Sequence, residues 1–321
     1  MELIRGIHNI KASHLGCVLS IGNFDGVHLG HQAVLSRLLF EAKRLQVPAT
    51  VLIFEPQPAE LFSGENAPAR LSRLRDKFIQ LDKLGLDRLL CVAFTHKFAN
   101  LSAQDFIEEL LIKKLGVKFL VIGDDFHFGY QRKGDFELLK KAGKKYGFEV
   151  VDTHSLTQKD HRISSSRIRD ALAAGDMQQA ALMLGRKYSI TGRVAHGREL
   201  GRTIGVPTAN LLLKRRVSPV SGVFVVSVQG IDNKIYQGVA NIGQRPTVGG
   251  VRQQLEVHIF NFNANLYGLQ LEVVLEEKIR DEVRFDSFAE LKIQIDKDIK
   301  QAKQWHLLNK QPQTTEDAGI R

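Results

Sequence analysis

The sequence predicts a parallel α/β domain over residues 1–186, followed by an antiparallel β domain with a C-terminal helix over residues 187–309. Three observations support this prediction. The 321 residues exceed the roughly 100–200 residues of one typical domain. The first part alternates short β-branched runs with helical patterns, which is typical of a parallel sheet covered on both faces. The second part has many short strand-like runs without intervening helices, which favours an antiparallel barrel or sandwich.

The alternation in the first part can be followed element by element. Apolar, β-branched runs predict strands at residues 17–23, 49–54, 88–94, 118–123 and 148–151. Apolar residues at helical spacing predict helices at residues 31–45, 73–84, 103–115, 136–146 and 166–184. Ligands of parallel sheets bind outside the carboxyl ends of the strands, so we expect the chemistry of this domain at that edge.

The second part shows a different pattern. Gly, Pro and Asn residues separate predicted strands at residues 187–194, 222–230, 235–241, 254–261 and 269–279. Ser287 precedes Glu290 by three residues, which is a capping box and predicts the start of a helix. Its apolar stripe consists of Phe288, Leu291, Ile295 and Ile299. Residues 310–321 are polar and aperiodic, which predicts a loose tail.

The charge of the chain favours anionic small substrates over nucleic acid. Lys and Arg number 45 against 35 Asp and Glu, which gives a net charge of +10. Residues 1–186 hold 26 basic and 21 acidic side chains, and the remainder holds 19 and 14, so the excess is +5 in each part. A nucleic-acid-binding tail would concentrate the charge instead. The alternative, a nucleic-acid-binding regulator, predicts salt-sensitive binding of RNA or DNA.

The cysteines and the apolar segments indicate a cytoplasmic protein without a membrane partner. Cys17 and Cys91 lie far apart and match no metal-binding spacing, so neither a disulfide framework nor a structural zinc site is expected. Two free thiols suit a reducing compartment. Residues 1–14 contain no signal-peptide core. The longest charge-free stretches have 15 residues, fewer than the about 18 that a spanning helix needs.

A first candidate for chemistry is residues 20–32, which read SIGNFDGVHLGHQ. The segment follows a predicted strand, turns at its glycines and enters a helix, whose free N–H groups and dipole suit phosphate. His28 and His31 flank Gly30, so both imidazoles can face one oxyanion and stabilise charge that grows at phosphorus. Two alternatives remain. The histidines are surface residues, or they bind zinc, which would need a third ligand that no nearby cluster supplies.

A second candidate is residues 163–172, which read ISSSRIRDAL. Consecutive serines open a helix there, where their hydroxyls cap it. Arg167 and Arg169 follow in the first turn and oppose the helix dipole, a mismatch that an anionic ligand would relieve. The alternative is an ordinary serine cap followed by solvated arginines.

Two candidates lie in the second part. Residues 197–211 read GRELGRTIGVPTANL, a Gly-rich turn in which Thr208 and Asn210 offer the oxygen ligands that Mg²⁺ prefers. Residues 254–260 read QLEVHIF and alternate, so Glu256 and His258 lie on one face of a strand. A carboxylate on a rigid strand can accept the proton of an attacking hydroxyl. The alternatives are an ordinary surface loop and a solvated strand glutamate.

The strings GNFDGVHLGH, ISSSRIR and PTAN together resemble the bacterial bifunctional riboflavin kinase/FMN adenylyltransferase (FAD synthetase) family, over about 300 residues. The resemblance implies a Rossmann-like nucleotidylyltransferase domain with a parallel sheet, followed by an antiparallel β-barrel flavokinase domain with a C-terminal helix. It implies phosphorylation of riboflavin to FMN in the second domain and adenylylation of FMN to FAD, with release of pyrophosphate, in the first. The substrates would be riboflavin, FMN and ATP, with Mg²⁺, in a monomer or weak homo-oligomer.

For the first domain, the resemblance assigns catalysis to His28 and His31. It assigns flavin contacts to the segment GDDFHFG, namely to Asp125, Phe126 and Phe128. The residues implied for ATP binding are Gly22, Asn23, Phe24, Asp25, Gly30, Ser164, Ser165, Ser166 and Arg169. Ser166 stands where the family often has Thr, and Gln57 where many members have His. The roles of Gln57 and His127 stay open.

For the second domain, the resemblance makes Glu256 the catalytic base. Thr208 and Asn210 would hold Mg²⁺, and Arg245 and Arg280 would contact the flavin. The residues implied for ATP binding are Gly205, Pro207 and Thr208. Asn265 stands where members often have Asp. A further alternative is that one half alone is active and the other is a flavin-sensing or docking module.

Overall fold

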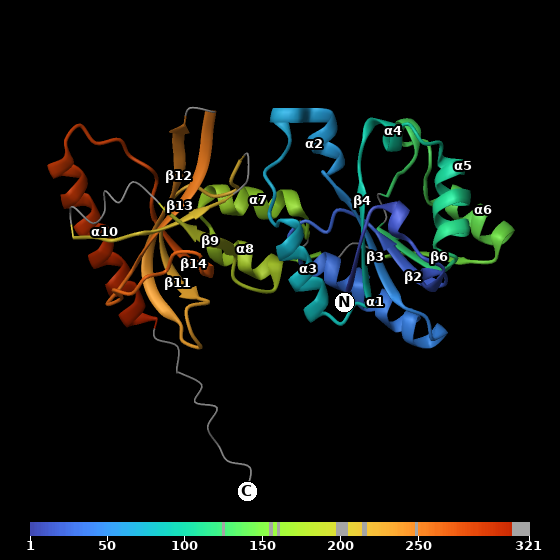
Figure 1. The fold of residues 1–321 in the computed structure, drawn as a ribbon, viewed down its shortest axis with the longest axis horizontal. Helices are drawn as coiled ribbons and strands as arrows, with labels where there is room; N and C mark the ends of the chain where they lie inside the picture. The colour runs from blue at the N-terminus through green and yellow to red at the C-terminus, as the bar shows by residue number, and fades with distance from the viewer. Residues whose placement is uncertain are drawn as a thin grey trace, which may run out of the picture. The chain divides into compact units, whose positions relative to one another are not determined.

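The computed structural model describes residues 1–123, 126–153, 157–158, 161–196, 205–213, 217–247 and 250–309. The chain divides into two compact units (Figure 1). The first comprises Met1–Asp170 and Leu182–Arg186, and the second comprises Ala171–Ala181 and Lys187–Arg321.

The first unit contains a six-stranded sheet in which each strand pairs in parallel, in the order β1-β4-β3-β2-β5-β6. The predicted parallel sheet is thereby confirmed. Its strands are β1 (Glu2–Arg5), β2 (Cys17–Ile21), β3 (Ala49–Glu55), β4 (Arg88–Ala93), β5 (Val117–Gly123) and β6 (Glu149–Thr153). The edge strand β1 was not predicted. A separate two-stranded sheet pairs β7 (Thr157–Gln158) with β8 (His161–Arg162).

Helices cover both faces of the sheet and form two hydrophobic cores (Figure 1). On one face, α1 (Leu29–Leu45) and α3 (Leu74–Lys83) bury leucines such as Leu38 and Leu81 against the strands. On the other face, a helical segment and α6 (Phe136–Tyr146) bury Phe106 and Leu139. That segment was predicted as one α-helix, but it is a short α5 (Ala103–Asp105) continued by the π-helical Phe106–Lys114. The short helices α2 (Pro58–Ser63) and α4 (His96–Ala99) follow β3 and β4.

The predicted helix over residues 166–184 is two helices, α7 (Ser165–Ala174) and α8 (Met177–Leu184). Gly175 between them has φ +82°, a left-handed conformation that ends an α-helix and favours glycine. Asp176 then accepts a hydrogen bond from the Gln179 N–H at 2.8 Å, which caps the second helix. The apolar periodicity continues across this break, so the sequence pattern did not indicate the break.

The second unit contains a closed six-stranded antiparallel barrel in the order β10-β13-β12-β11-β14-β9. This result confirms the predicted barrel and decides against a sandwich. Its strands are β9 (Ser189–Ala195), β10 (Ala209–Leu212), β11 (Gly222–Gln229), β12 (Tyr236–Thr247), β13 (Gly250–Ile259) and β14 (Gln270–Arg280). Alternate apolar side chains such as Phe224, Ile242 and Leu255 are fully buried. Strand β10, which begins within residues 207–210 (the PTAN segment), was not predicted.

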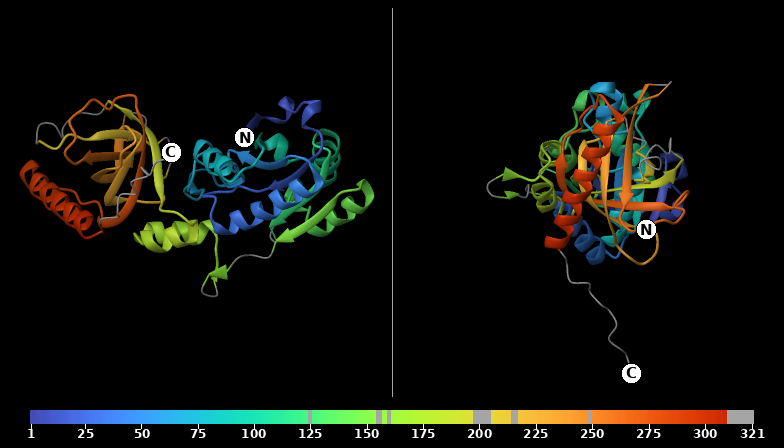
Figure 2. Two further views of the ribbon diagram at one scale, coloured as in Figure 1. Left: turned by 90° about the horizontal axis from the view of Figure 1, so that it is seen from below. Right: turned by 90° about the vertical axis from the view of Figure 1, so that its left-hand side faces the viewer.

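Helix α10 (Phe288–Leu308) packs on the outside of the barrel (Figure 2). Ser287 caps it by accepting a hydrogen bond from the Glu290 N–H at 3.2 Å, as predicted. Its apolar side contributes Ala302 and Trp305 to a cluster with Val223 and Val239 of the barrel. The helix therefore buries apolar surface that the closed sheet leaves on its outer face.

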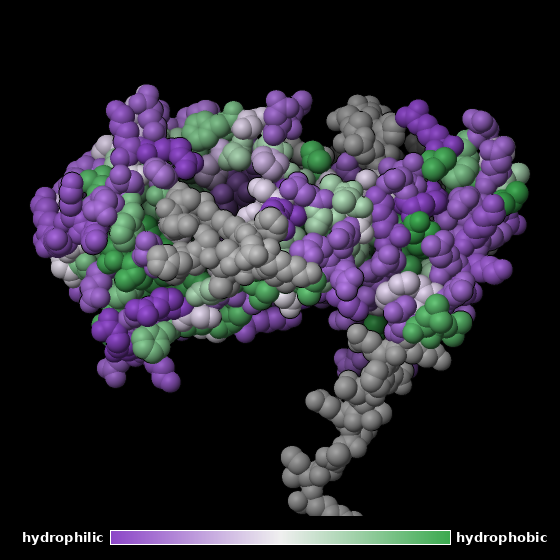
Figure 3. All heavy atoms as spheres, turned by 180° about the vertical axis from the view of Figure 1, so that it is seen from behind, coloured by the Kyte–Doolittle hydropathy of each residue, from purple (hydrophilic) through white to green (hydrophobic). Residues whose placement is uncertain are grey.

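The surface of the described residues is largely polar. Hydrophilic side chains cover most of the face in Figure 3, and hydrophobic side chains lie between them in small groups. Within the described part of the chain, the longest helices are too short or too polar to cross a bilayer.

A buried ion pair fixes α10 to the end of β14. The Arg280 guanidinium donates to both carboxylate oxygens of Asp298, at 2.8–3.1 Å, and the Asp298 side chain is 5% exposed. We expect Asp298→Ala to lower the free energy of unfolding by about 3 kcal/mol, because it leaves a partly buried cation without its partner. Asp296→Ala, at an exposed position on the same helix, should change it by less than about 0.5 kcal/mol. Denaturant unfolding followed by circular dichroism measures both, and equal effects would contradict this role.

Candidate functional sites

The loop after β2 turns sharply at the carboxyl edge of the parallel sheet. Phe24, Gly26 and Val27 all have positive φ, at 45°, 84° and 43°. Non-glycine residues in this region carry strain, which is concentrated at functional sites in proteins. Gly26 has no room for a side chain, because a Cβ atom would lie 2.9 Å from Leu71. The backbone therefore turns directly from β2 into α1 at the predicted position.

The two histidines lie together at the N-terminus of α1. The His28 ring caps the helix, with Nδ1 accepting a hydrogen bond from the His31 N–H at 3.3 Å. The two imidazoles stack with their centroids 3.6 Å apart. Gly30 makes this possible, because a Cβ atom there would lie 3.1 Å from the His28 ring. His28 is buried and His31 is half-buried.

The surroundings of the His31 ring favour its neutral form. Burial, and then the neighbouring His28 and Lys77, lower the pKa of His31 well below its usual value. Its Nδ1 atom is buried and has no hydrogen-bond partner among the described residues. A neutral imidazole at a helix N-terminus can donate one N–H to an incoming anion. It does so without adding the positive charge of an imidazolium.

Asp25 connects this loop to two distant segments. Its carboxylate accepts hydrogen bonds from the Leu71 and Ser72 N–H groups at 3.0 Å, and from the Arg169 guanidinium at 2.7 Å. The backbone carbonyl of Asp25 also accepts from the Ser165 hydroxyl at 2.9 Å. The start of α7 is therefore held against the loop between β2 and α1. The two sequence motifs of the first domain thus lie close together, as expected if they form one site. Asp25 and Arg169 form an ion pair with each other. Their contact with ATP stays a prediction.

The loop after β3 carries a second ion-pair cluster that the sequence did not indicate. Arg70 donates to the Glu55 carboxylate at 2.6 and 3.0 Å and to the Glu60 carboxylate at 2.5 Å. The Gln57 N–H donates to Glu60 at 2.8 Å, so this cluster also fixes the start of α2. Fully buried Lys77 of α3 lies close enough for these carboxylates to affect its pKa.

The candidate catalytic carboxylate of the barrel lies between two asparagines. In the strand register, Glu256 of β13 pairs with Asn210 of β10 and with Asn241 of β12. Directly opposed residues have their Cβ atoms about 5 Å apart on the same face of the sheet, so these three polar side chains form one row. Leu255 and Val257 beside Glu256 are fully buried, so Glu256 faces away from the barrel core.

The PTAN segment is tied to the same face of β13. His258 Nδ1 lies 2.9 Å from the Pro207 carbonyl oxygen, and because a carbonyl only accepts, the ring N–H is the donor. The Asn210 side-chain oxygen accepts from the Gln254 side-chain amide. Burial lowers the pKa of His258, so its ring is neutral near pH 7. Residues 254, 256 and 258 thus share one face of β13. Residue 258 holds the start of the PTAN segment, residue 254 holds its end, and the carboxylate of residue 256 lies between them.

The comparisons with known proteins agree with this arrangement. The FAD synthetase family model matches residues 10–167, and the riboflavin kinase family model matches residues 184–306. The chain is 54% identical over 311 residues to a bifunctional riboflavin kinase/FMN adenylyltransferase of Escherichia coli K12, covering 97% of this chain and 99% of that one. It belongs to the bifunctional riboflavin kinase/FMN adenylyltransferase family.

Two further matches extend over nearly the whole chain. A bifunctional riboflavin kinase/FMN adenylyltransferase of Haemophilus influenzae is 52% identical over 303 residues, covering 94% of this chain and 98% of that one. A crystal structure titled as a macrolide-efflux protein from Streptococcus pneumoniae has a TM-score of 0.80 and 32% identity, covering 95% of this chain and all of that one. The similarity to these two proteins thus includes both units.

Some residues that the family resemblance suggested for the flavin have contacts of another kind. Phe128 is 7% exposed and belongs to the core beneath the sheet, whereas its stacked neighbour Phe126 is half-buried. Arg280 is bonded to Asp298, as described above. Asp125 and the side chain of Arg245 lie outside the described residues. Flavin binding by these residues stays a prediction.

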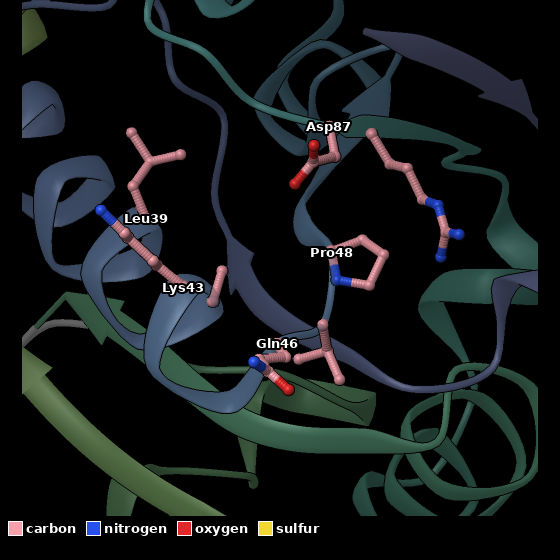
Figure 4. Close-up of a pocket in the computed structure, with 8 residues that line it drawn as sticks. Leu39, Lys43, Gln46, Pro48 and Asp87 are labelled. Carbon is pink, nitrogen blue, oxygen red and sulfur yellow. The ribbon is translucent and has the colours of Figure 1, made fainter.

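A hollow of about 700 Å³ lies at the amino edge of the sheet, opposite the edge that carries the histidines. Figure 4 shows the residues that line it. It is lined by the end of α1 and by residues just before β3 and β4, including Lys43, Pro48 and Asp87. This is the amino edge of the strands, where parallel α/β sheets do not place their ligands. It holds none of the motif residues of the bifunctional family.

Proposed function

We propose that the chain makes FAD from riboflavin in two ATP-dependent steps at two separate sites. The observation that carries this proposal is the presence of two different arrangements, one in each unit. A stacked imidazole pair lies at the N-terminus of α1, and a strand carboxylate lies between two asparagines in the barrel. The first arrangement suits charge stabilisation at phosphorus, and the second suits removal of a proton from a hydroxyl.

In the barrel, Glu256 takes the proton of the riboflavin 5′-hydroxyl as that oxygen forms a bond to the γ-phosphorus of ATP. The bond from the γ-phosphorus to the β–γ bridging oxygen breaks, and ADP leaves. Phosphoryl transfer depends mainly on positioning and on charge stabilisation, so the fixed PTAN segment matters as much as the base.

The PTAN segment fits a hard cation. The Asn210 side-chain oxygen accepts one hydrogen bond, which leaves a second lone pair, and Thr208 is half-buried beside it. Oxygen ligands of this kind suit Mg²⁺, which proteins usually hold through a few groups together with substrate phosphates. Thr208 and Asn210 would hold Mg²⁺, which neutralises phosphate charge when bound.

At the sheet edge, an FMN phosphate oxygen attacks the α-phosphorus of a second ATP. The bond from the α-phosphorus to the α–β bridging oxygen breaks, and pyrophosphate leaves. Two anions must approach each other, so repulsion has to be offset. His28, His31 and the N–H groups at the starts of α1 and α7 supply hydrogen-bond donors for this, and no covalent intermediate is required.

The setting of these reactions is also part of the proposal. The buried thiols of Cys17 and Cys91 are unpaired, which supports a reducing compartment such as the cytoplasm. The protein would act there as a monomer or weak homo-oligomer on small molecules, without nucleic acid or membrane partners.

Incubation of the full chain with riboflavin and Mg²⁺–ATP tests the proposal. Chromatography of the flavins should show FMN first and FAD later. Formation of FMN without FAD would support the alternative that only one half is active. Absence of both products would overturn the proposed function.

The hydrogen bond from His258 to Pro207 leads to a prediction about the phosphorylation step. We expect His258→Ala to raise the KM for Mg²⁺–ATP in riboflavin phosphorylation by about tenfold, because one hydrogen bond that positions the PTAN segment is lost. His258→Asn, whose side-chain amide can donate to the same carbonyl, should keep the KM within about threefold. Steady-state kinetics measures both, and adenylylation of supplied FMN should stay unchanged. Equal effects of the two variants would contradict the positioning role.

A further inference from the structure

A fully buried lysine lies on α3 and acts electrostatically on His31. Lys77 of α3 is 0% exposed, and its Nζ atom has no hydrogen-bond partner among the described residues. It lies on the inner side of the helix, four residues before the equally buried Leu81. An ammonium group that is buried without a hydrogen bond is costly, and proteins rarely keep one. A methionine would fill the same space without that cost, so packing alone does not account for this residue.

Three carboxylates act on the buried amine of Lys77 and favour its protonated form. Burial, which is the largest effect, and Arg70 lower the pKa of Lys77, and the carboxylates of Asp25, Glu55 and Glu60 offset this lowering only in part. These three carboxylates share only two arginines in the described structure. Asp25 pairs with Arg169, whereas Glu55 and Glu60 both pair with Arg70. Two guanidinium groups face three carboxylates, and a charged Lys77 makes the cluster neutral.

The position of this cluster connects it with the reaction at the sheet edge. Asp25 belongs to the loop between β2 and α1, and Lys77 also acts on the His31 ring, whose pKa it helps to lower. FMN and ATP would each bring negative charge to this region. Without the Lys77 ammonium, the charges of this cluster would sum to one negative, which would oppose the approach of two anions to the adjoining loop.

We propose that Lys77 provides a buried positive charge that accelerates adenylyl transfer at the histidine site, acting without contact with the substrates. This inference rests on the proposed function of the first unit. It adds to that function a residue that no motif of the sequence contains.

The first test is Lys77→Met in the full chain. We expect adenylylation of supplied FMN to fall about ten- to a hundredfold, because a unit charge in a protein interior acts over several ångströms. Riboflavin phosphorylation by the same molecules should stay unchanged. Lys83→Met, at an exposed position of the same helix, is the matched control and should leave both rates unchanged. Adenylylation at the wild-type rate in Lys77→Met would overturn the proposal.

The second test separates charge from packing. Lys77→Met combined with Glu55→Gln restores the balance of the cluster, since one carboxylate is removed together with the ammonium. We expect the double variant to adenylylate FMN at least about threefold faster than Lys77→Met alone, whereas two losses of packing would add to each other. A double variant as slow as Lys77→Met, or slower, would overturn the role of charge.

A third variant keeps the test decisive if Lys77→Met does not fold, as judged by its thermal unfolding. Lys77→Gln retains a polar end without the charge, and the same loss of adenylylation is expected. The wild-type chain must form FAD from FMN in these experiments. If it does, a normal rate in the Lys77 variants removes only the role of Lys77, whereas its failure would remove the proposed function itself.

Discussion

Replacing His28 with Asn is expected to stop FAD formation while FMN still accumulates from riboflavin. The imidazole would no longer stabilise charge at the α-phosphorus, and loss of one such donor costs about 10²–10³ in turnover. Asn is chosen because its side-chain oxygen can still accept the His31 N–H, so the cap of α1 is retained. His31→Ala should have an effect of the same size. Chromatography of flavins after incubation with riboflavin and Mg²⁺–ATP measures both steps at once.

An exposed histidine provides the control for these variants. His96 lies at the start of α4 and is exposed, so His96→Ala should leave FMN and FAD formation unchanged. The account would be wrong if His28→Asn and His31→Ala formed FAD at the wild-type rate. It would also be wrong if they lost riboflavin phosphorylation together with adenylylation.

Replacing Glu256 with Gln is expected to have the reverse effect. Gln has the shape of Glu and can pack beside Asn210 and Asn241, but it cannot take the proton of the riboflavin hydroxyl. A positioned general base contributes about 10²–10⁴ to a rate, so FMN formation should fall by that factor. Supplied FMN should still be converted to FAD, because that step occurs in the other unit.

The exposed Glu277 on β14 is the matched control for Glu256. Glu277→Gln removes a strand carboxylate away from the asparagine row and should leave both rates unchanged. A Glu256→Gln variant that phosphorylates riboflavin at the wild-type rate would exclude Glu256 as the base. The two sites would then not divide the labour as proposed.

The sequence predicted the architecture well wherever local patterns were strong. Buried runs such as residues 49–54 and the helix cap at Ser287 depend only on neighbouring residues, and the structure has them where expected. The short edge strand β1 was not predicted, because its four residues show no clear pattern and pair with the distant β4. The break at Gly175 was not predicted either, because apolar residues recur on both sides of it.

The candidate sites show the same division. His28, His31 and Glu256 belong to contiguous motifs, so sequence reasoning could select them. The contacts of Asp25 with residues 71, 72 and 169 join segments 46 to 144 residues apart, and no local pattern indicates them. The sequence contains one indication of Lys77, which is its position as a charged residue on the apolar side of the helix predicted over residues 73–84. The residues whose carboxylates act on Lys77 are distant from it in the sequence, so no local pattern indicates that interaction.

A mixture of two inactive variants tests the central claim, that each unit carries one complete step. Glu256→Gln and His28→Asn chains are combined with riboflavin and Mg²⁺–ATP, and the flavins are separated over time. We expect each variant alone to form no FAD, with FMN accumulating only in the His28→Asn sample, and the mixture to form FAD. A mixture that accumulates FMN without forming FAD, or a Glu256→Gln chain that also fails to convert supplied FMN, would contradict the account.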